Sequence, residues 1–181
     1  MKNKEYYDKI YNKSVEYGKH YSEIIYFPIY KNILKRLHVE DAILELGCGA
    51  GQLAHYLRDN NFINYTGIDF SPKAIELARG RTNQIFLTDD IFKATFNFFY
   101  DTVIAVEVFE HLYYEKILQK INKGTQIFFS VPNFKTDSHL FSWSSKEEVK
   151  EDFEHDIDIV SIETPLKIKD KVWYLVNGFV K

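Results

Sequence analysis

A short apolar segment, residues 42–46, runs directly into a turn with glycine at alternate positions, Gly47, Gly49 and Gly51. Glu45 is the only charged residue of the segment, which is typical of a strand covered on both faces of a parallel sheet. Glycine tolerates positive φ and lets a ligand approach the main chain, and the helix that should follow offers unpaired N–H groups at its start. This junction therefore predicts an α/β fold that binds a small polar ligand at the turn.

The glycine spacing departs from two common nucleotide-binding patterns. A dinucleotide loop reads G-x-G-x-x-G, whereas this chain has Gln52 where the third glycine should fall. The pattern G-x-x-x-x-G-K-[ST] does not occur in the sequence. The string E-L-G-C-G-A-G-Q at residues 45–52 instead resembles the first motif of class I S-adenosylmethionine (SAM)-dependent methyltransferases, which have an acidic residue two positions before the first glycine.

Composition narrows the class of protein further. A chain of 181 residues with 45% hydrophobic residues fits one domain, 1–181, with an N-terminal helical arm at 1–38 and a core at 39–181. The net charge of −3 makes a nucleic-acid partner unlikely. The single cysteine, Cys48, favours a reducing compartment. No apolar run approaches the ~18 residues that span a membrane, so we expect a cytoplasmic protein without membrane contact.

The family resemblance implies a specific architecture. Class I methyltransferases have a Rossmann-like, doubly wound sheet of seven strands in which the last strand is antiparallel. The pattern here predicts strands at 42–46, 65–69, 84–87, 101–106, 125–131, 157–162 and 172–180, with helices at 52–59, 71–79, 113–122 and 146–154. Only a short stretch separates the third strand from the fourth, so the helix between them should be short or absent. The resemblance implies SAM as cofactor and S-adenosylhomocysteine (SAH) as product.

Asp69 ends the second expected strand, Tyr65 to Asp69, at the edge of the sheet that carries the glycine turn. A carboxylate there can accept both hydroxyls of a ribose in charge-assisted hydrogen bonds. The alternative is a helix-capping role, but Ser71 and Pro72 already supply the cap and the first position of the next helix. We therefore interpret Asp69 as a ribose ligand.

The segment after the third strand contains two adjacent acids. By the family resemblance, Asp90 would accept the amine of adenine and the backbone N–H of Ile91 would meet a ring nitrogen, with Asp89 as the alternative in register. One of the two acids should only shape the turn. Together with the first motif, the resemblance implies a set of cofactor-binding residues: Glu45, Gly47, Cys48, Gly49, Gln52, Asp69, Phe70, Asp90, Ile91 and Val106.

Glu107, Glu110 and His111 follow the clearest buried strand in the pattern E-x-x-E-H, which resembles the fourth motif of many small O- and N-methyltransferases. If helical, the three side chains would share one side of a turn. His111 is a candidate general base because imidazole titrates near neutral pH. The same motif resembles the metal site of the small-RNA 3′-terminal 2′-O-methyltransferases, so the three could instead hold a divalent metal ion. A third possibility is a structural role in shaping the pocket.

Candidate substrate contacts come from two other parts of the chain. The segment S-V-P-N-F at 130–134 resembles the one that follows the fifth strand in many of these enzymes, and it should bring Asn133 and Phe134 to the acceptor. His139 could be a fourth metal ligand or a substrate contact. Seven of the 13 tyrosines lie in the first thirty residues, and Tyr11 and Tyr21 among them could form a lid over the ligand. The same rings could instead only attach the arm to the sheet.

These features predict transfer of a methyl group from SAM to an oxygen or nitrogen acceptor. Size and charge favour a small molecule such as a sugar, a nucleotide-linked sugar or a polyketide-like metabolite. Two alternatives stay open, a metal-dependent RNA 2′-O-methyltransferase and a non-catalytic cofactor-binding subunit. The sequence does not define the oligomeric state.

Overall fold

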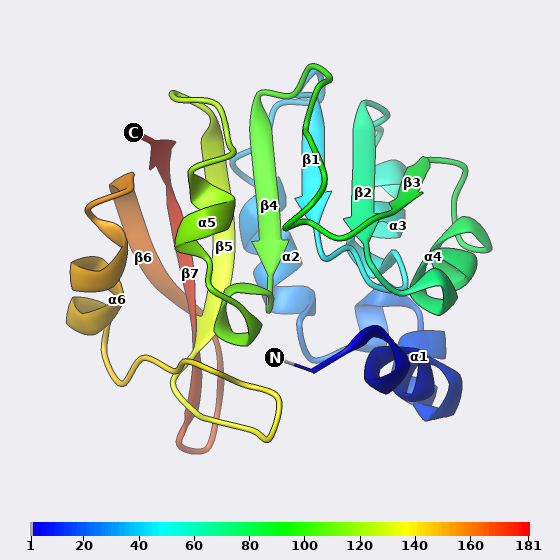
Figure 1. The fold of residues 1–181 in the computed structure, drawn as a ribbon, viewed down its shortest axis with the longest axis horizontal. Coiled ribbons are helices and arrows are strands. Elements are labelled where there is room, and N and C mark those ends of the chain that lie inside the picture. Colours follow the sequence, from blue (N-terminus) through cyan, green and yellow to red (C-terminus); the bar gives the residue numbers. More distant parts are fainter. Residues whose placement is uncertain (1) are drawn as a thin grey trace.

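The protein is described by a computed structural model that covers residues 2–181. Its centre is a seven-stranded sheet with the order β3-β2-β1-β4-β5-β7-β6 (Figure 1). The first five strands pair in parallel, and β7 is antiparallel to both of its neighbours. This is the doubly wound arrangement of class I methyltransferases that the resemblance implied. The strands are β1 (Ile43–Leu46), β2 (Tyr65–Asp69), β3 (Ile85–Thr88), β4 (Thr102–Val106), β5 (Gln126–Pro132), β6 (Ile157–Ile168) and β7 (Lys171–Val180).

Helices cover both faces of this sheet (Figure 1). One hydrophobic cluster joins the sheet to α2, α3 and α4, and the other joins it to η3, α5 and α6. The arm also contains α1, η1 and η2. The bounds are α1 (Lys4–Lys13), η1 (Val15–Gly18), η2 (Tyr21–Glu23), α2 (Phe27–Leu34), α3 (Gln52–Asp59), α4 (Pro72–Arg79), η3 (Phe109–His111), α5 (Glu115–Leu118) and α6 (Lys146–Phe153).

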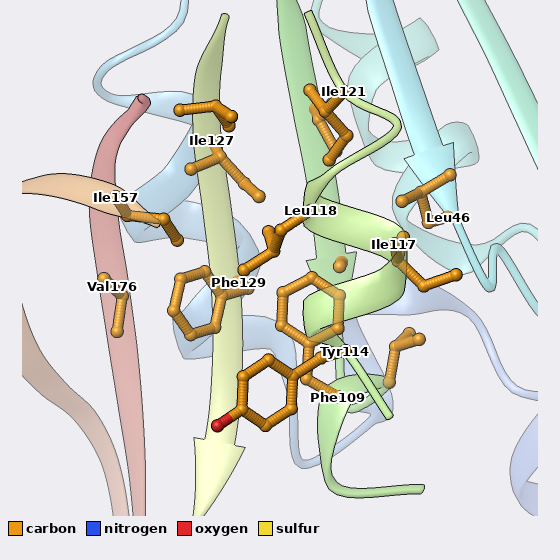
Figure 2. Close-up of a cluster of buried hydrophobic side chains, with 14 of the residues drawn as sticks. Leu46, Phe109, Tyr114, Ile117, Leu118, Ile121, Ile127, Phe129, Ile157 and Val176 are labelled. Atoms are coloured by element: carbon orange, nitrogen blue, oxygen red, sulfur yellow. The ribbon is translucent and has the colours of Figure 1, made fainter. Parts of the chain in front are cut away.

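Successive side chains of a strand point to opposite faces of the sheet. Alternate residues of the central strands therefore belong to different clusters. Leu44 and Leu46 of β1 lie in the cluster with α5, whereas Ile43 lies in the cluster with α2 and α3. Figure 2 shows the first of these, where the rings of Phe109 and Phe129 pack with their centroids 5.1 Å apart. The packed sheet therefore brings the carboxyl ends of all its parallel strands to one edge.

Two expected elements differ from the structure. The helix expected at 113–122 is regular only over α5, because the following turns form i→i+3 bonds such as Lys120 N–H to the Ile117 carbonyl. The second is β6, which extends through Pro165 where a loop was expected. Pro165 lies at a break in the β6 and β7 register, on an edge strand where a missing N–H donor is tolerated.

Two other expectations, on the connection from β3 to β4 and on the cap of α4, are confirmed. The helix that could join β3 to β4 is missing, and that segment is irregular. Ser71 caps α4 by accepting the Ala74 N–H at 3.1 Å, with Pro72 at the first helical position. Among the described residues 2–181, no helix is long and apolar enough to cross a membrane.

Candidate functional site

A cavity of about 280 Å³ lies at the carboxyl ends of the parallel strands. The N-terminal arm lies below this edge of the sheet in Figure 1, with α1 next to α4. The wall is formed by the glycine turn, the residues that follow β2, β3 and β4, and the arm. Its lining includes Lys2, Tyr7, Tyr11, Tyr17, Tyr26, Glu45, Gly47, Cys48, Gly49, Gln52, Asp69, Phe70, Asp90, Ile91, Val106, Glu107, Glu110, His111 and His139.

The glycine turn forms a hollow, or cradle, at the cavity wall, and side chains at its glycine positions would clash with neighbouring residues. Gly49 has φ +53°, and a Cβ there would come within 2.9 Å of the Tyr11 hydroxyl. Gly51 has φ +73°, and a Cβ there would lie 2.8 Å from the Cβ of Ala78. Both positions need glycine because of the left-handed backbone and the close neighbours. The turn therefore exposes main-chain atoms to the cavity, as an adenosyl cofactor requires.

Asp69 is buried at the end of β2 and faces this turn. Its Oδ2 accepts the Gly49 N–H at 3.0 Å and its Oδ1 accepts the Ser71 N–H at 2.8 Å. Burial raises the pKa of the Asp69 carboxyl to about 6, and the two N–H donors oppose this rise. Each carboxylate oxygen can accept a further bond, so the geometry leaves room for the expected pair of ribose hydroxyls.

Two other acids contribute to the cofactor side of the wall. Glu45 is buried and accepts the Tyr65 hydroxyl, and burial raises the pKa of its carboxyl to about 8. Asp90 lines the cavity with Ile91, and its Oδ1 accepts the Phe92 N–H at 3.0 Å. Asp89 is exposed and accepts the Asp90 N–H at 2.8 Å. This placement favours Asp90 over the register alternative Asp89.

Glu107 directly follows β4, and its backbone conformation and two side-chain hydrogen bonds fix its position. Its backbone has φ +56°, a strained value for a residue with a side chain. Its Oε1 accepts the Ser130 hydroxyl at 2.7 Å and its Oε2 accepts the Trp173 indole N–H at 2.8 Å. Burial raises the pKa of the Glu107 carboxyl, and hydrogen bonds with Ser130, Trp173 and the neighbouring Glu110 carboxyl oppose the rise. The strained backbone and the two bonds hold the carboxyl in one orientation at the cavity wall.

Glu110 has a different environment from Glu107. Its side chain is fully buried, and no N–H or O–H donor of another residue type among residues 2–181 reaches either carboxylate oxygen, so the Glu107 carboxyl beside it can bond to it only by sharing a proton. Its Oε1 lies 3.8 Å from Nε2 of His111. Burial and the nearby Glu107 charge raise the pKa of the Glu110 carboxyl. The two glutamates do not lie on one helical turn as expected, because η3 begins only at Phe109.

In both His111 and His139, Nε2 is available to accept a proton or bind a ligand. Nδ1 of His111 lies 3.0 Å from the Ser138 carbonyl, and Nδ1 of His139 lies 3.1 Å from the Phe134 carbonyl. A carbonyl only accepts, so each Nδ1 carries the proton and each neutral Nε2 is an acceptor. Burial lowers the pKa of both imidazoles. His111 is thus held in the neutral form that a general base needs.

One ligand atom each of Glu110, His111 and His139 lies within 4.8 Å of the others. Such a group could hold a divalent metal ion, with each Nδ1–H bonded to a carbonyl as in many metal sites. Glu107, the fourth ligand of the expected set, has both carboxylate oxygens bonded to Ser130 and Trp173. The structure therefore brings three of the four expected ligands together.

The arm contributes tyrosines to the wall and is fastened to the core. Tyr11 and Tyr17 pack with ring centroids 4.4 Å apart above the glycine turn. The Gln52 amide donates to the carbonyls of Glu16 and Lys19, at 3.0 and 3.2 Å. Gln52, expected to contact the cofactor, thus uses its amide group to hold the arm over the cavity.

Three expected substrate contacts lie outside the cavity wall. Tyr21 donates its hydroxyl to Asp59 at 2.7 Å and packs among surface rings of the arm and α3. Asn133 joins the turn before β7, since its side chain bonds Val172 N–H and the Asp170 carbonyl. Phe134 packs behind the wall on Trp173 and His139. Each of these side chains is committed to packing or to local hydrogen bonds.

Sequence reasoning missed the residues that support the site. Ser130 and Trp173 orient Glu107, Tyr65 bonds Glu45, and Arg81 donates to the carbonyls of Tyr17 and Lys19. Ser130 stands in the S-V-P-N segment, so its motif could have drawn attention to it. Nothing in the sequence near Trp173 or Arg81 signals these contacts, because each joins positions far apart in the chain.

Comparisons with known proteins identify the family of the chain. The model of the methyltransferase domain family matches residues 18–160, which is more than half of the chain. Cyclopropane-fatty-acyl-phospholipid synthase from Escherichia coli K12 is 25% identical over 129 residues, or 64% of this chain and 33% of that protein. Malonyl-[acyl-carrier protein] O-methyltransferase from Anoxybacillus flavithermus is 29% identical over 146 residues, or 75% of this chain and 53% of that protein. The chain thus spans about a third to a half of these relatives.

A solved structure shows the same fold. Magnesium protoporphyrin IX methyltransferase from Synechocystis PCC 6803, crystallised with bound SAM, superposes with a TM-score of 0.71 at 13% identity. The match covers 100% of this chain and 98% of the other. The family match, the strand order and the cradle at the glycine turn lead to one conclusion. The chain belongs to the methyltransferase domain family, and its sheet has the fold of the class I SAM-dependent methyltransferases.

Proposed function

We propose that this protein methylates an oxygen or nitrogen atom of a small molecule, the class that size and net charge favour, such as a sugar or a nucleotide-linked sugar. The observation that carries the proposal is one cavity that runs from the glycine turn to Glu107, Glu110 and His111. The relatives are named for different acceptors, a phospholipid-linked acyl chain and a carrier-bound malonyl group. The names of these relatives therefore do not indicate which acceptor this protein methylates.

The residues divide into two groups by position. We assign the cofactor to the glycine turn with Asp69 at the ribose and Asp90 with Ile91 at the adenine. Tyr7 separates this part from the rest, since its ring packs edge-on against Phe70 and, at 6.1 Å between centroids, against His111. The acceptor then occupies the part of the cavity beside Glu107, Glu110 and His111.

SAM, when bound, supplies an electrophilic methyl group. The enzyme's own contribution is to hold the acceptor atom in line with that methyl group and to exclude water. The arm covers the cavity through Tyr11 and Tyr17 and thereby supports both tasks. His111, held neutral with Nε2 free, is placed to take a proton from the acceptor.

Calorimetry with SAH tests the cofactor half of this proposal. Asp69→Asn keeps the shape of the side chain but loses the charge that strengthens two ribose bonds. We expect its affinity for SAH to fall by about 1.5–3 kcal/mol, or roughly 10- to 150-fold. Asp89→Asn, which changes an exposed neighbouring acid, is the control and should bind SAH like the wild type. Wild-type protein that fails to bind SAH would overturn the assignment.

Release of SAH with a panel of small acceptors tests the second half. Turnover by the isolated chain would exclude a non-catalytic subunit. Turnover of an RNA 3′ end in place of every small molecule would contradict the proposed acceptor class.

A further inference from the structure

The Glu110 carboxyl is the one acid in the cavity wall that accepts no hydrogen bond from an N–H or O–H donor of another residue type. Its side chain is 0% exposed, no such donor among the described residues reaches its oxygens, and the neighbouring Glu107 carboxyl can only share a proton with it. A buried carboxyl without partners is costly unless a ligand completes it. Its position beside His111 places that ligand in the acceptor part of the cavity.

The groups around Glu110 accept hydrogen bonds and do not donate them. Nε2 of His111 and Nε2 of His139 are acceptors, because each Nδ1–H is bonded to a carbonyl. One ligand atom each of Glu110, His111 and His139 lies within 4.8 Å of the others, and Nε2 of His111 lies 3.8 Å from Oε1 of Glu110. A ligand with several N–H donors on one atom, as in an ammonium group, matches this set.

The lining of the cavity offers little to an anion. Five carboxyl side chains line it, and Lys2 is the one lysine or arginine among the lining residues. Burial raises the pKa of the Glu45, Glu107 and Glu110 carboxyls, so some of these groups carry protons when no ligand is bound. A cation that binds beside these groups favours their ionised form, whereas the phosphates of a nucleotide-linked acceptor would find a single lysine to pair with.

Aromatic rings surround the same carboxyls. Tyr7 packs edge-on to His111, and Tyr26 packs edge-on to Trp173 at 6.3 Å between centroids. Tyr7 and Tyr26 line the same cavity as Glu110. Faces of such rings attract ammonium groups in addition to the carboxylate. A metal ion would gain little from these rings.

We propose that the acceptor is a primary or secondary alkylamine, such as the amino group of an amino sugar, held as an ammonium ion by Glu110. This inference rests on the proposed function and narrows it to nitrogen methylation. The ammonium gives one proton to Nε2 of His111 and becomes a neutral amine. The nitrogen lone pair then bonds to the methyl carbon, while the carbon–sulfur bond of SAM breaks and its electron pair stays on sulfur. The product is a protonated N-methylamine plus SAH, and His111 returns its proton to solvent.

Calorimetry on SAH-saturated enzyme tests this proposal with matched probes. Benzylamine is compared with benzyl alcohol, and n-butylamine with n-butanol, each up to millimolar concentration. We expect at least one amine to bind about tenfold or more tightly than its alcohol, since bonds to a charged partner are the stronger ones. Glu110→Gln should lose at least about tenfold in amine affinity while its SAH affinity is unchanged.

Glu115→Gln is the matched control, because it removes one carboxylate from an exposed position on α5 outside the cavity. It should bind amine like the wild type. If Glu110→Gln does not fold, Glu110→Asp replaces it, since the shorter side chain keeps the acid but draws its carboxyl back from the ligand and should also weaken amine binding.

Several results would overturn the amine assignment. These are no amine binding at millimolar concentration, equal binding of amine and alcohol, or unchanged amine affinity in Glu110→Gln. Tight binding of Mg²⁺, Mn²⁺ or Zn²⁺ that His139→Ala abolishes would assign the cluster to a metal ion instead. A wild-type enzyme that binds SAH but no amine refutes only this inference, whereas one that does not bind SAH refutes the proposed function.

Discussion

The bond from the Trp173 indole N–H to Glu107 gives a prediction whose size depends on pH. Trp173→Phe removes this 2.8 Å bond but keeps an aromatic ring at the site. A bond to a charged acceptor stabilises a protein by about 1.5–3 kcal/mol, and one to a neutral acceptor by about 0.5–1.5 kcal/mol. The free-energy cost of the change should therefore be larger where Glu107 is ionised.

The sign follows from the direction of the Glu107 shift. Burial raises the pKa of Glu107 in the folded state to about 7, from 4.5. The folded state then binds the proton more tightly than the unfolded state, so this group lowers stability as pH rises from about 4.5 to about 7. Trp173 opposes that shift, and its loss raises the pKa further. The variant should therefore lose additional stability as the pH rises above 7.

Urea unfolding of wild type and Trp173→Phe at pH 5 and pH 8 measures this difference. We expect a loss of about 1 kcal/mol more at pH 8 than at pH 5, beyond the ring-size cost common to both. Trp143→Phe is the matched control, since the Trp143 indole N–H donates at 2.7 Å to Asp152, which is exposed. Its cost should be similar at both pH values. An equal or larger cost for Trp173→Phe at pH 5 would refute the reasoning.

Three further predictions concern the glycine turn. Gly49→Ala should destabilise the fold by about 1–2 kcal/mol, because alanine is strained at this positive φ, and should weaken SAH binding measured by calorimetry. Adding Tyr11→Phe to this variant should restore part of the SAH affinity, because it removes the hydroxyl that the new Cβ meets. No recovery of affinity in the double variant would argue against that contact. Cys48 is 5% exposed and burial raises the pKa of its thiol, so iodoacetamide should label it far more slowly than a free thiol, and fast labelling would contradict this burial. Gln52→Leu should increase hydrogen exchange at residues 16–19 and weaken SAH binding, whereas unchanged exchange would show that the amide does not fasten the arm.

The sequence predicted the fold well where local signals agree. The glycine turn, the Ser71 cap with Pro72 and the buried run at β4 each signal their element within a few residues. The sequence predicted element boundaries less well where pairing between distant strands determines them. β6 crosses Pro165 because β7 pairs with it on both sides of the irregularity, and no local pattern indicates that.

The candidate site shows the same division. Asp69 and Asp90 were expected from their places after strands, and both line the cavity. Asn133 and Phe134 were expected there for the same reason, but their side chains are taken up by the turn before β7 and by Trp173. Position after a strand brings a residue near the edge of the sheet, but it does not determine where the side chain points.

The sequence by itself determined the α/β class, the glycine turn and the family, because these depend on residues that are adjacent or regularly spaced. Only the tertiary structure decided that Ser130 and Trp173 donate to the two oxygens of Glu107 while no such donor of the described residues reaches Glu110, and that Gln52 holds the arm. The physical reason is that the desolvation and partners of a side chain depend on what other elements bring to it. In this protein those partners come from β5, β7 and the arm, which are distant in the chain.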